Sequence, residues 1–244
     1  MFGSFGTVFA HRIPKRDSLR GRSVCPKCGA GVTAFENIPV LSYVLQRGRC
    51  RHCGERIHWR YPVIELTTGL LFALSAWKFG VSVEALAFSA FFWVLVVLTA
   101  IDLEHKLLPN RVVYPALVAG WASLTIAAFV EGDPGRLVGA ALGAAIFGGF
   151  FFLVAFIYPA GMGGGDVKLA FVLGTFLGYL RAPGLVLLGM FLSFLIGSII
   201  GVIVMRVGGG GRKTQVPFGP FLALGTVLAI FIGDPLVDLY LRGL

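Results

Sequence analysis

The chain has 244 residues, of which 57% are hydrophobic and only 14% charged, and its mean hydropathy is +0.84. Soluble domains usually carry about 25% charged residues. The composition therefore excludes an ordinary water-soluble domain and predicts a membrane protein whose spans need about 20 apolar residues each. The net charge of +9 is accounted for by membrane topology and requires no nucleic acid partner.

In chain order, residues 1–10 are apolar but too few to cross a membrane. We expect them to be the cytosolic end of a truncated first transmembrane helix, and the alternative is an interfacial stub. Residues 11–61 form a polar cytosolic module, and residues 62–244 form a transmembrane bundle. The predicted fold is an all-α polytopic helix bundle of about seven or eight spans. The full-length candidates lie near 62–79, 83–101, 112–130, 137–158, 167–180, 184–205 and 217–233.

The basic residues are distributed unevenly across these spans. With residues 11–61 in the cytosol, 17 of the 21 Lys and Arg residues fall on the cytosolic side. The four on the outer side are Lys78, Arg136, Arg181 and Arg242. The positive-inside rule fixes this orientation, and membrane lipid with anionic headgroups is the expected partner of the basic face. Glu84, near the outer surface, is expected to be solvated.

The polar module holds the only four cysteines of the chain, in two C-x2-C pairs. The pairs are Cys25 with Cys28 and Cys50 with Cys53. Two such pairs at this spacing predict a closed tetrathiolate zinc site with a structural role. The alternative is two disulfides, which the reducing cytosol disfavours.

Two aspartates stand out because a carboxylate is costly in a bilayer unless it faces a wet cavity or a partner. Asp102 ends the span 83–101, and Asp166 directly follows a glycine run that includes Gly163 and Gly165. Because an even number of crossings separates the two aspartates, both lie at the cytosolic face of the membrane. Two adjacent carboxylates share a proton, so that one acts as a base toward water and the other as an acid toward a peptide carbonyl. The alternative is that each aspartate only caps a helix or pairs with a lysine.

Three further polar residues are weaker candidates, and two glycine pairs are expected to serve packing. Glu65, Glu104 and Lys168 are expected to tune the aspartates or to contact a substrate. Separately, Gly139-x3-Gly143 and Gly197-x3-Gly201 have the spacing that lets membrane helices approach closely.

The sequence around Asp166 matches the GxGD pattern of intramembrane aspartyl proteases, and the whole chain resembles the bacterial prepilin peptidases, or type IV leader peptidases. The matching blocks are Gly3-Ser4-Phe5 with Arg12-Ile13-Pro14, Arg22-Ser23-Val24-Cys25-Pro26-Lys27-Cys28, Asn37-Ile38-Pro39 with Ser42-Tyr43, Arg47-Gly48-Arg49-Cys50, Arg60-Tyr61-Pro62-Val63-Ile64-Glu65, Ile101-Asp102-Leu103-Glu104, Gly163-Gly164-Gly165-Asp166-Val167-Lys168 and Pro217-Phe218-Gly219-Pro220. The chain departs from the family at Thr7, where an asparagine is usual.

The resemblance implies an enzyme of the bacterial inner membrane that removes the basic leader from type IV prepilins and pseudopilins on the cytosolic side. It implies that Asp102 and Asp166 are the catalytic pair. It further implies that the protein N-methylates the new N-terminal residue from S-adenosylmethionine, although no glycine-rich nucleotide motif marks a site for that cofactor. Two other classes stay open: a transporter with proton-relaying carboxylates, and an assembly factor whose zinc module docks a partner.

Overall fold

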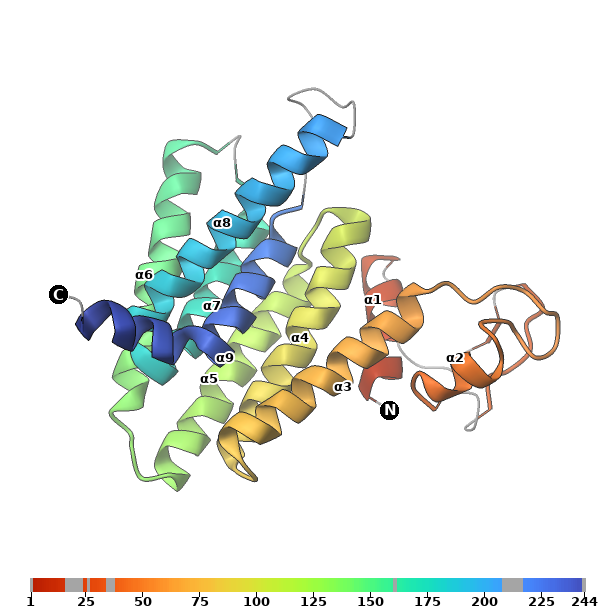
Figure 1. Cartoon of the computed structure of the whole chain (residues 1–244), viewed down its shortest axis with the longest axis horizontal. Helices are drawn as coiled ribbons and strands as arrows, with labels where there is room; N and C mark the ends of the chain where they lie inside the picture. Colours follow the sequence, from red (N-terminus) through yellow and green to blue (C-terminus); the bar gives the residue numbers. More distant parts are fainter. Residues whose placement is uncertain are drawn as a thin grey trace.

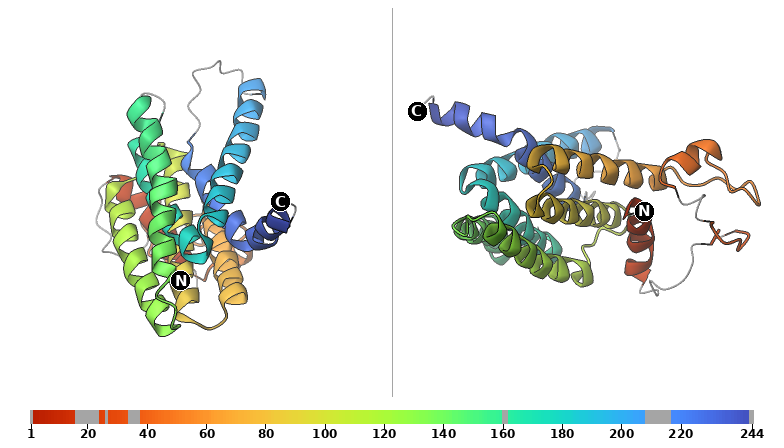
Figure 2. Two further views of the ribbon diagram at one scale, coloured as in Figure 1. Left: turned by 90° about the vertical axis from the view of Figure 1, so that its left-hand side faces the viewer. Right: turned by 90° about the horizontal axis from the view of Figure 1, so that it is seen from below.

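The computed structural model describes residues 2–15, 24–25, 27–33, 38–159, 162–207 and 217–242. Helices α3 to α9 form one bundle, α1 packs against α3 and α4, and the short α2 lies to one side of the bundle (Figures 1 and 2). The all-α class is confirmed. The helices are α1 (Phe2–Lys15), α2 (Leu41–Leu45), α3 (Arg60–Phe79), α4 (Val83–His105), α5 (Asn110–Val130), α6 (Arg136–Ile157), α7 (Gly164–Arg181), α8 (Gly184–Val207) and α9 (Gly219–Arg242).

In the described part of the chain, five helices are long and apolar enough to cross a membrane, namely α4, α5, α6, α8 and α9. The remaining two predicted spans, α3 and α7, are long helices that pack inside the same bundle. Charge distinguishes α7 from its neighbours, because its 18 residues include Asp166, Lys168 and Arg181. The protein is therefore a multi-pass membrane protein.

The helix ends differ from the apolar runs at both termini of the bundle. Helix α1 continues past Ala10 to Lys15, so the expected boundary between a first helix and the polar module falls inside a helix. Helix α9 continues to Arg242 instead of ending near residue 233. Hydropathy marks where a chain leaves the apolar layer, whereas a helix ends only where its backbone hydrogen bonds end.

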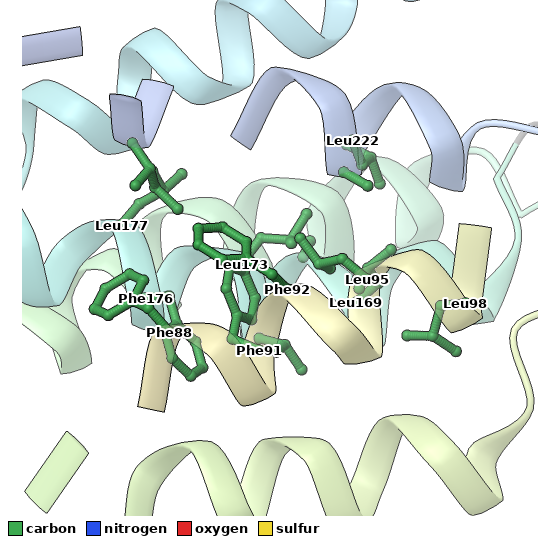
Figure 3. Close-up of a cluster of buried hydrophobic side chains, with 14 of the residues drawn as sticks. Phe88, Phe91, Phe92, Leu95, Leu98, Leu169, Leu173, Phe176, Leu177 and Leu222 are labelled. Atoms are coloured by element: carbon green, nitrogen blue, oxygen red, sulfur yellow. The ribbon is translucent and has the colours of Figure 1, made fainter. Parts of the chain in front are cut away.

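The centre of the bundle is an aromatic and leucine core shared by α4, α7 and α9 (Figure 3). The rings of Phe91 and Phe176 stack with centroids 4.0 Å apart, and Phe88 meets Phe176 edge to face at 5.2 Å. Leu222 of α9 completes the cluster and has no exposed surface. Because lipid tails are as apolar as these side chains, close packing rather than escape from water stabilises this core.

Glycines bring α6 and α7 into backbone contact. A Cβ atom on Gly143 would lie 2.2 Å from the carbonyl oxygen of Gly174, and one on Gly139 would lie 2.5 Å from that of Gly178. The predicted packing role of Gly139 and Gly143 is therefore confirmed. The prediction for the second pair is only half right. A Cβ on Gly197 would lie 3.0 Å from the ring of Phe218, whereas nothing lies within 4 Å of a Cβ on Gly201.

Several charged residues at the end of the bundle opposite Asp102 form ion pairs. Arg136 donates to Glu84 at 2.6 Å and 3.0 Å, lies 3.3 Å from Glu131, and stacks over the ring of Tyr179 at 4.0 Å. The expectation that Glu84 is solvated is wrong, since its residue is only 8% exposed. Two further ion pairs at this end hold the last turns of α9: Lys78 with Asp234 at 2.9 Å, and Arg181 with Asp238 at 2.7 Å.

The contact between α6 and α7 predicts that two alanine substitutions on α6 will change the stability of the protein differently. Gly143→Ala should destabilise the protein by about 3 kcal/mol, because the new methyl group must push two backbones apart. Gly149→Ala, whose Cβ would meet nothing within 4 Å, should be neutral or slightly stabilising. Thermal unfolding in detergent compares the two, and equal melting temperatures would contradict the proposed backbone contact.

Candidate active site and metal centre

Asp102 lies in the last turn of α4, and its residue is only 4% exposed. One of its carboxylate oxygens, Oδ2, accepts a hydrogen bond from the backbone N–H of Gly219 at 3.1 Å. Gly219 is the first residue of α9, so the unpaired N–H groups and the positive end of that helix point at the carboxylate. The N-terminus of α9 is therefore an anion-binding group for Asp102.

Gly219 allows this contact because it has no side chain. A Cβ atom there would lie 2.6 Å from Oδ2 of Asp102 and 3.5 Å from Leu108. The sequence around it, Pro217-Phe218-Gly219-Pro220, suggests only a kinked helix entry at the same membrane face. Gly219 is thus a site residue that the residue pattern did not reveal, although it stands in a block shared with the leader peptidases.

Asp166 is the third residue of α7, and the residue that caps the helix is Gly163. The alternative in which Asp166 is itself the N-cap is therefore wrong. Its N–H donates to the carbonyl of Gly163 at 3.0 Å, and its carboxylate folds back toward the N–H of Gly163. A Cβ on Gly163 would lie 2.9 Å from Oδ2 of Asp166, so a glycine is needed beneath the carboxylate.

The helix ends that carry Asp166 and contact Asp102 converge on the short connection between α4 and α5. Leu108, in that connection, lies 2.8 Å from a Cβ on Gly165 and 3.5 Å from one on Gly219, so the first turns of α7 and α9 converge on it. The carboxylate of Asp102 is near enough to act on Asp166 by its charge. In the described residues neither aspartate has an ion-pair partner. The arrangement is that of two uncompensated carboxylates, each at a helix N-terminus.

Two of the weaker candidates have structural partners beside this pair. Lys168 donates to the side-chain oxygen of Asn110 at 2.8 Å and lies 5.3 Å over the ring of Tyr114, which ties α7 to the start of α5. Glu104 forms an ion pair with Arg60, the first residue of α3. Both contacts connect helices next to the aspartates, and neither one reaches a carboxylate of the pair.

Glu65 belongs to a different junction. It accepts a hydrogen bond from the hydroxyl of Ser4 at 2.5 Å and one from the N–H of Val40 at 2.8 Å, so it joins α1, α3 and the segment before α2. Thr7, which departs from the family pattern, is buried and donates to the carbonyl of Ser4 at 2.7 Å. These residues attach α1 to the bundle. None of these hydrogen bonds, all within the described residues, involves Asp102 or Asp166.

The four cysteines converge, as predicted. Each offers a sulfur atom, and the four ligand atoms all lie within 4.8 Å of one another. The sulfurs of Cys25 and Cys53, one from each pair, are 3.8 Å apart, and all four cysteines are free. Two thiolates on a tetrahedral zinc ion with Zn–S bonds of about 2.3 Å lie about 3.8 Å apart. The geometry fits a four-coordinate metal, and no disulfide joins these four cysteines.

The backbone builds both cysteine pairs in the same way. Cys25 donates to Ala30 and accepts from Gly29, and Cys50 donates to Glu55 and accepts from Gly54. Both glycines have a φ of +70°, a conformation that favours glycine. Antiparallel bridges at Val24–Gly31 and Arg49–Arg56 close the two hairpins.

A charge pair and backbone donors support the metal site. Lys27 of the first hairpin forms an ion pair with Glu55 of the second; this contact raises the pKa of Lys27 and lowers that of Glu55. The N–H groups of Cys28 and Lys27 lower the pKa of the Cys25 thiol to about 6. A thiolate is the form that binds metal, so Cys25 is ready to bind at neutral pH.

Comparison with known proteins covers nearly the whole chain. Residues 1–79 match the family model described as the bacterial peptidase A24 N-terminal domain, and residues 89–205 match the type IV leader peptidase family. The chain is similar to a prepilin leader peptidase/N-methyltransferase of Legionella pneumophila, at 36% identity over 90% of this chain and 75% of the relative. It is also similar to proteins of the same name from Pseudomonas aeruginosa, at 34% over 99% of this chain and 90% of the relative, and from Bacillus subtilis, at 35% over 99% and 94%. No solved structure matches the chain.

The cysteine geometry predicts about one tightly bound zinc ion per chain. Cys25→Ser with Cys28→Ser should lose it, whereas His52→Ala, an exposed histidine inside the second hairpin but outside the sulfur cluster, should keep it. Because protons compete with the metal for the thiolates, a chelator should remove the ion faster as the pH falls. Elemental analysis of reduced protein measures both effects, and zinc-free parent protein would contradict the assignment.

Proposed function

Because the chain belongs to the type IV leader peptidase family, we propose that it hydrolyses the leader peptides of type IV prepilins and pseudopilins with Asp102 and Asp166 as the catalytic pair. The observation that carries the assignment is the N-terminus of α9 aimed at Asp102 beside a second carboxylate at the N-terminus of α7. A pair of this kind, without a cation to neutralise it, is suited to proton transfer.

The two carboxylates divide the proton transfers of peptide hydrolysis. Asp102, which accepts the N–H of Gly219, is the ionised partner and takes a proton from water. Asp166 is the protonated partner and donates to the carbonyl oxygen of the scissile peptide as the hydroxide adds to its carbon. When the tetrahedral intermediate collapses, the proton held by Asp102 passes to the leaving amine, and Asp166 recovers its proton from the oxygen.

The second activity follows from the names of the relatives, prepilin leader peptidase/N-methyltransferase. The new N-terminal amine accepts a methyl group, which S-adenosylmethionine would supply when bound. Cys25, Cys28, Cys50 and Cys53 would hold a structural zinc ion that keeps the two hairpins together. A closed four-sulfur site leaves no open position for substrate, so the metal stays outside the hydrolytic step.

The orientation follows from charge. With the cysteine region and both aspartates on the cytosolic side of a bacterial inner membrane, most basic residues face the cytosol. Lys78, Arg136 and Arg181 fall on the outer side, where each has an acidic partner. A proton-relaying transporter would distribute unpaired acids through the bilayer depth, and the clustering of Asp102 and Asp166 at one end disfavours it.

Removal of either carboxylate should abolish cleavage. Asp102→Asn and Asp166→Asn each leave a group that cannot exchange a proton, so we expect at least a 10³-fold loss in the rate of leader removal with normal abundance. Asp133→Asn, in the exposed turn at the opposite end, is the matched control and should keep the parent rate. The measurement is mass spectrometry of a prepilin incubated with purified protein. Near-parent activity in either site variant would rule out the pair.

Substitution of Gly219 should also slow leader removal strongly, although glycine contributes no side chain to the reaction. Gly219→Ala places a methyl group 2.6 Å from Oδ2 of Asp102, which must displace either α9 or the carboxylate. A displacement of about 1 Å in a catalytic group costs on the order of 100-fold in rate. Gly201→Ala, in α8 with nothing within 4 Å of the new atom, should leave the rate unchanged. Full activity in Gly219→Ala would show that the contact with Asp102 is dispensable.

A further inference from the structure

One segment of the cysteine region exposes both apolar and basic side chains, and neither the catalytic pair nor the metal site uses it. It consists of α2 and the hairpin that follows, and we call it the α2 face. Its apolar members are Leu41, Val44 and Leu45, and its basic members are Arg47, Arg49, Arg51 and Arg56.

The apolar part is one side of a helix turned away from the protein. Leu41, Val44 and Leu45 occupy positions i, i+3 and i+4, which share one side of a helix, and they are 52%, 63% and 74% exposed. The other side holds Tyr43, whose hydroxyl donates to the carbonyl of Ile57 at 3.4 Å and so attaches α2 to the hairpin. No residue of α2 is buried.

The positive charge of the basic part is not balanced by acidic side chains. All four arginines are exposed, and within the described ranges none of them forms an ion pair with an acidic side chain. Glu55, the one acidic residue of this hairpin, is already engaged by Lys27 from the other hairpin. The α2 face therefore attracts anions and repels a basic leader peptide, which excludes the substrate's leader as its occupant.

The position of α2 along the axis of α3 indicates which kind of partner the α2 face contacts. The N–H of Val40, just before α2, donates to Glu65, the sixth residue of α3. At a rise of 1.5 Å per residue, this contact lies about 7.5 Å inside the start of α3. Figure 1 accordingly shows α2 to the side of the first turns of α3. From the same turns, α3 presents Val63 and Leu66 outward, 46% and 61% exposed.

We propose that the α2 face docks on the anionic lipid headgroups of the membrane in which the bundle sits. Leu41, Val44 and Leu45 enter the interface beside the outward face of α3, and the four arginines contact lipid phosphates. Apolar side chains beside a cluster of arginines are the combination that holds a peripheral segment on an anionic leaflet. The interaction would hold the metal hairpins against the membrane surface, next to the helix ends that carry the aspartates.

The test uses the full-length protein in lipid nanodiscs made either of phosphatidylcholine alone or with about one third phosphatidylglycerol. Trypsin is added, and mass spectrometry follows cleavage after Arg47, Arg49, Arg51 and Arg56. We expect cleavage to be at least about fivefold slower in the anionic discs at low salt, and most of this protection to disappear in about 0.5 M salt. Equal cleavage rates in the two kinds of nanodisc would overturn the proposal.

Variants separate the α2 face from a general effect of lipid. Val44→Ser with Leu45→Ser removes apolar surface without adding charge and should lose most of the protection in anionic discs. Leu239→Ser with Leu241→Ser, two exposed leucines near the end of α9, should keep it. Bound zinc, measured in every sample, confirms that the hairpins are folded. Parent-like protection in the Val44 and Leu45 variant would contradict the role of the apolar side chains. The proteolysis assay does not depend on peptidase activity, so it stands even if the proposed function fails.

Discussion

The contact between the N-terminus of α9 and the carboxylate of Asp102 is the constraint on which the site depends. Two residues 117 positions apart must come within 3.1 Å, with no side chain between them. Glycine at position 219 makes that approach possible, and glycine at position 165 lets the first turn of α7 approach Leu108 in the same way. The backbone contact between α6 and α7 fixes how far α7 can shift. Close packing in the middle of the bundle thus sets the position of groups at its end.

Asp102 and Asp166 differ from the carboxylates at the other end of the bundle in having no basic partner in the described residues. At the end away from Asp102, Arg136 neutralises Glu84, and salt bridges hold Asp234 and Asp238, so those carboxylates serve only to fix helix positions. At the other end, helix N-termini replace cations. A helix end stabilises a negative charge through partial charges on N–H groups, without supplying a full positive charge that would hold a carboxylate permanently ionised. This difference is what the proposed proton transfers by Asp102 and Asp166 require.

Hydropathy and spacing predicted the class of the protein because both reflect forces that act along the sequence. Apolar runs of sufficient length indicate membrane-spanning helices, and two C-x2-C pairs predict a tetrahedral metal site. The even number of crossings between Asp102 and Asp166 predicts that both lie at one face of the membrane. The contacts that the sequence did not reveal are those between distant segments. Glu84 is buried because Arg136 reaches it from 52 positions away, and Gly219 matters only because Asp102 lies above it. The alternative in which Asp166 caps α7 fails because the cap is Gly163, the first of three successive glycines from 163 to 165, each of which could start a helix.

The metal region and the aspartates are separate sites, yet one side chain connects them. Arg60 begins α3 directly after the second hairpin, donates to the carbonyl of Ala100 and forms an ion pair with Glu104. These two residues stand on either side of Asp102 in the last turns of α4. The guanidinium therefore satisfies a backbone acceptor and anchors a carboxylate in the turn that positions Asp102. Through these Arg60 contacts, the second hairpin is linked to the turn of α4 that carries Asp102.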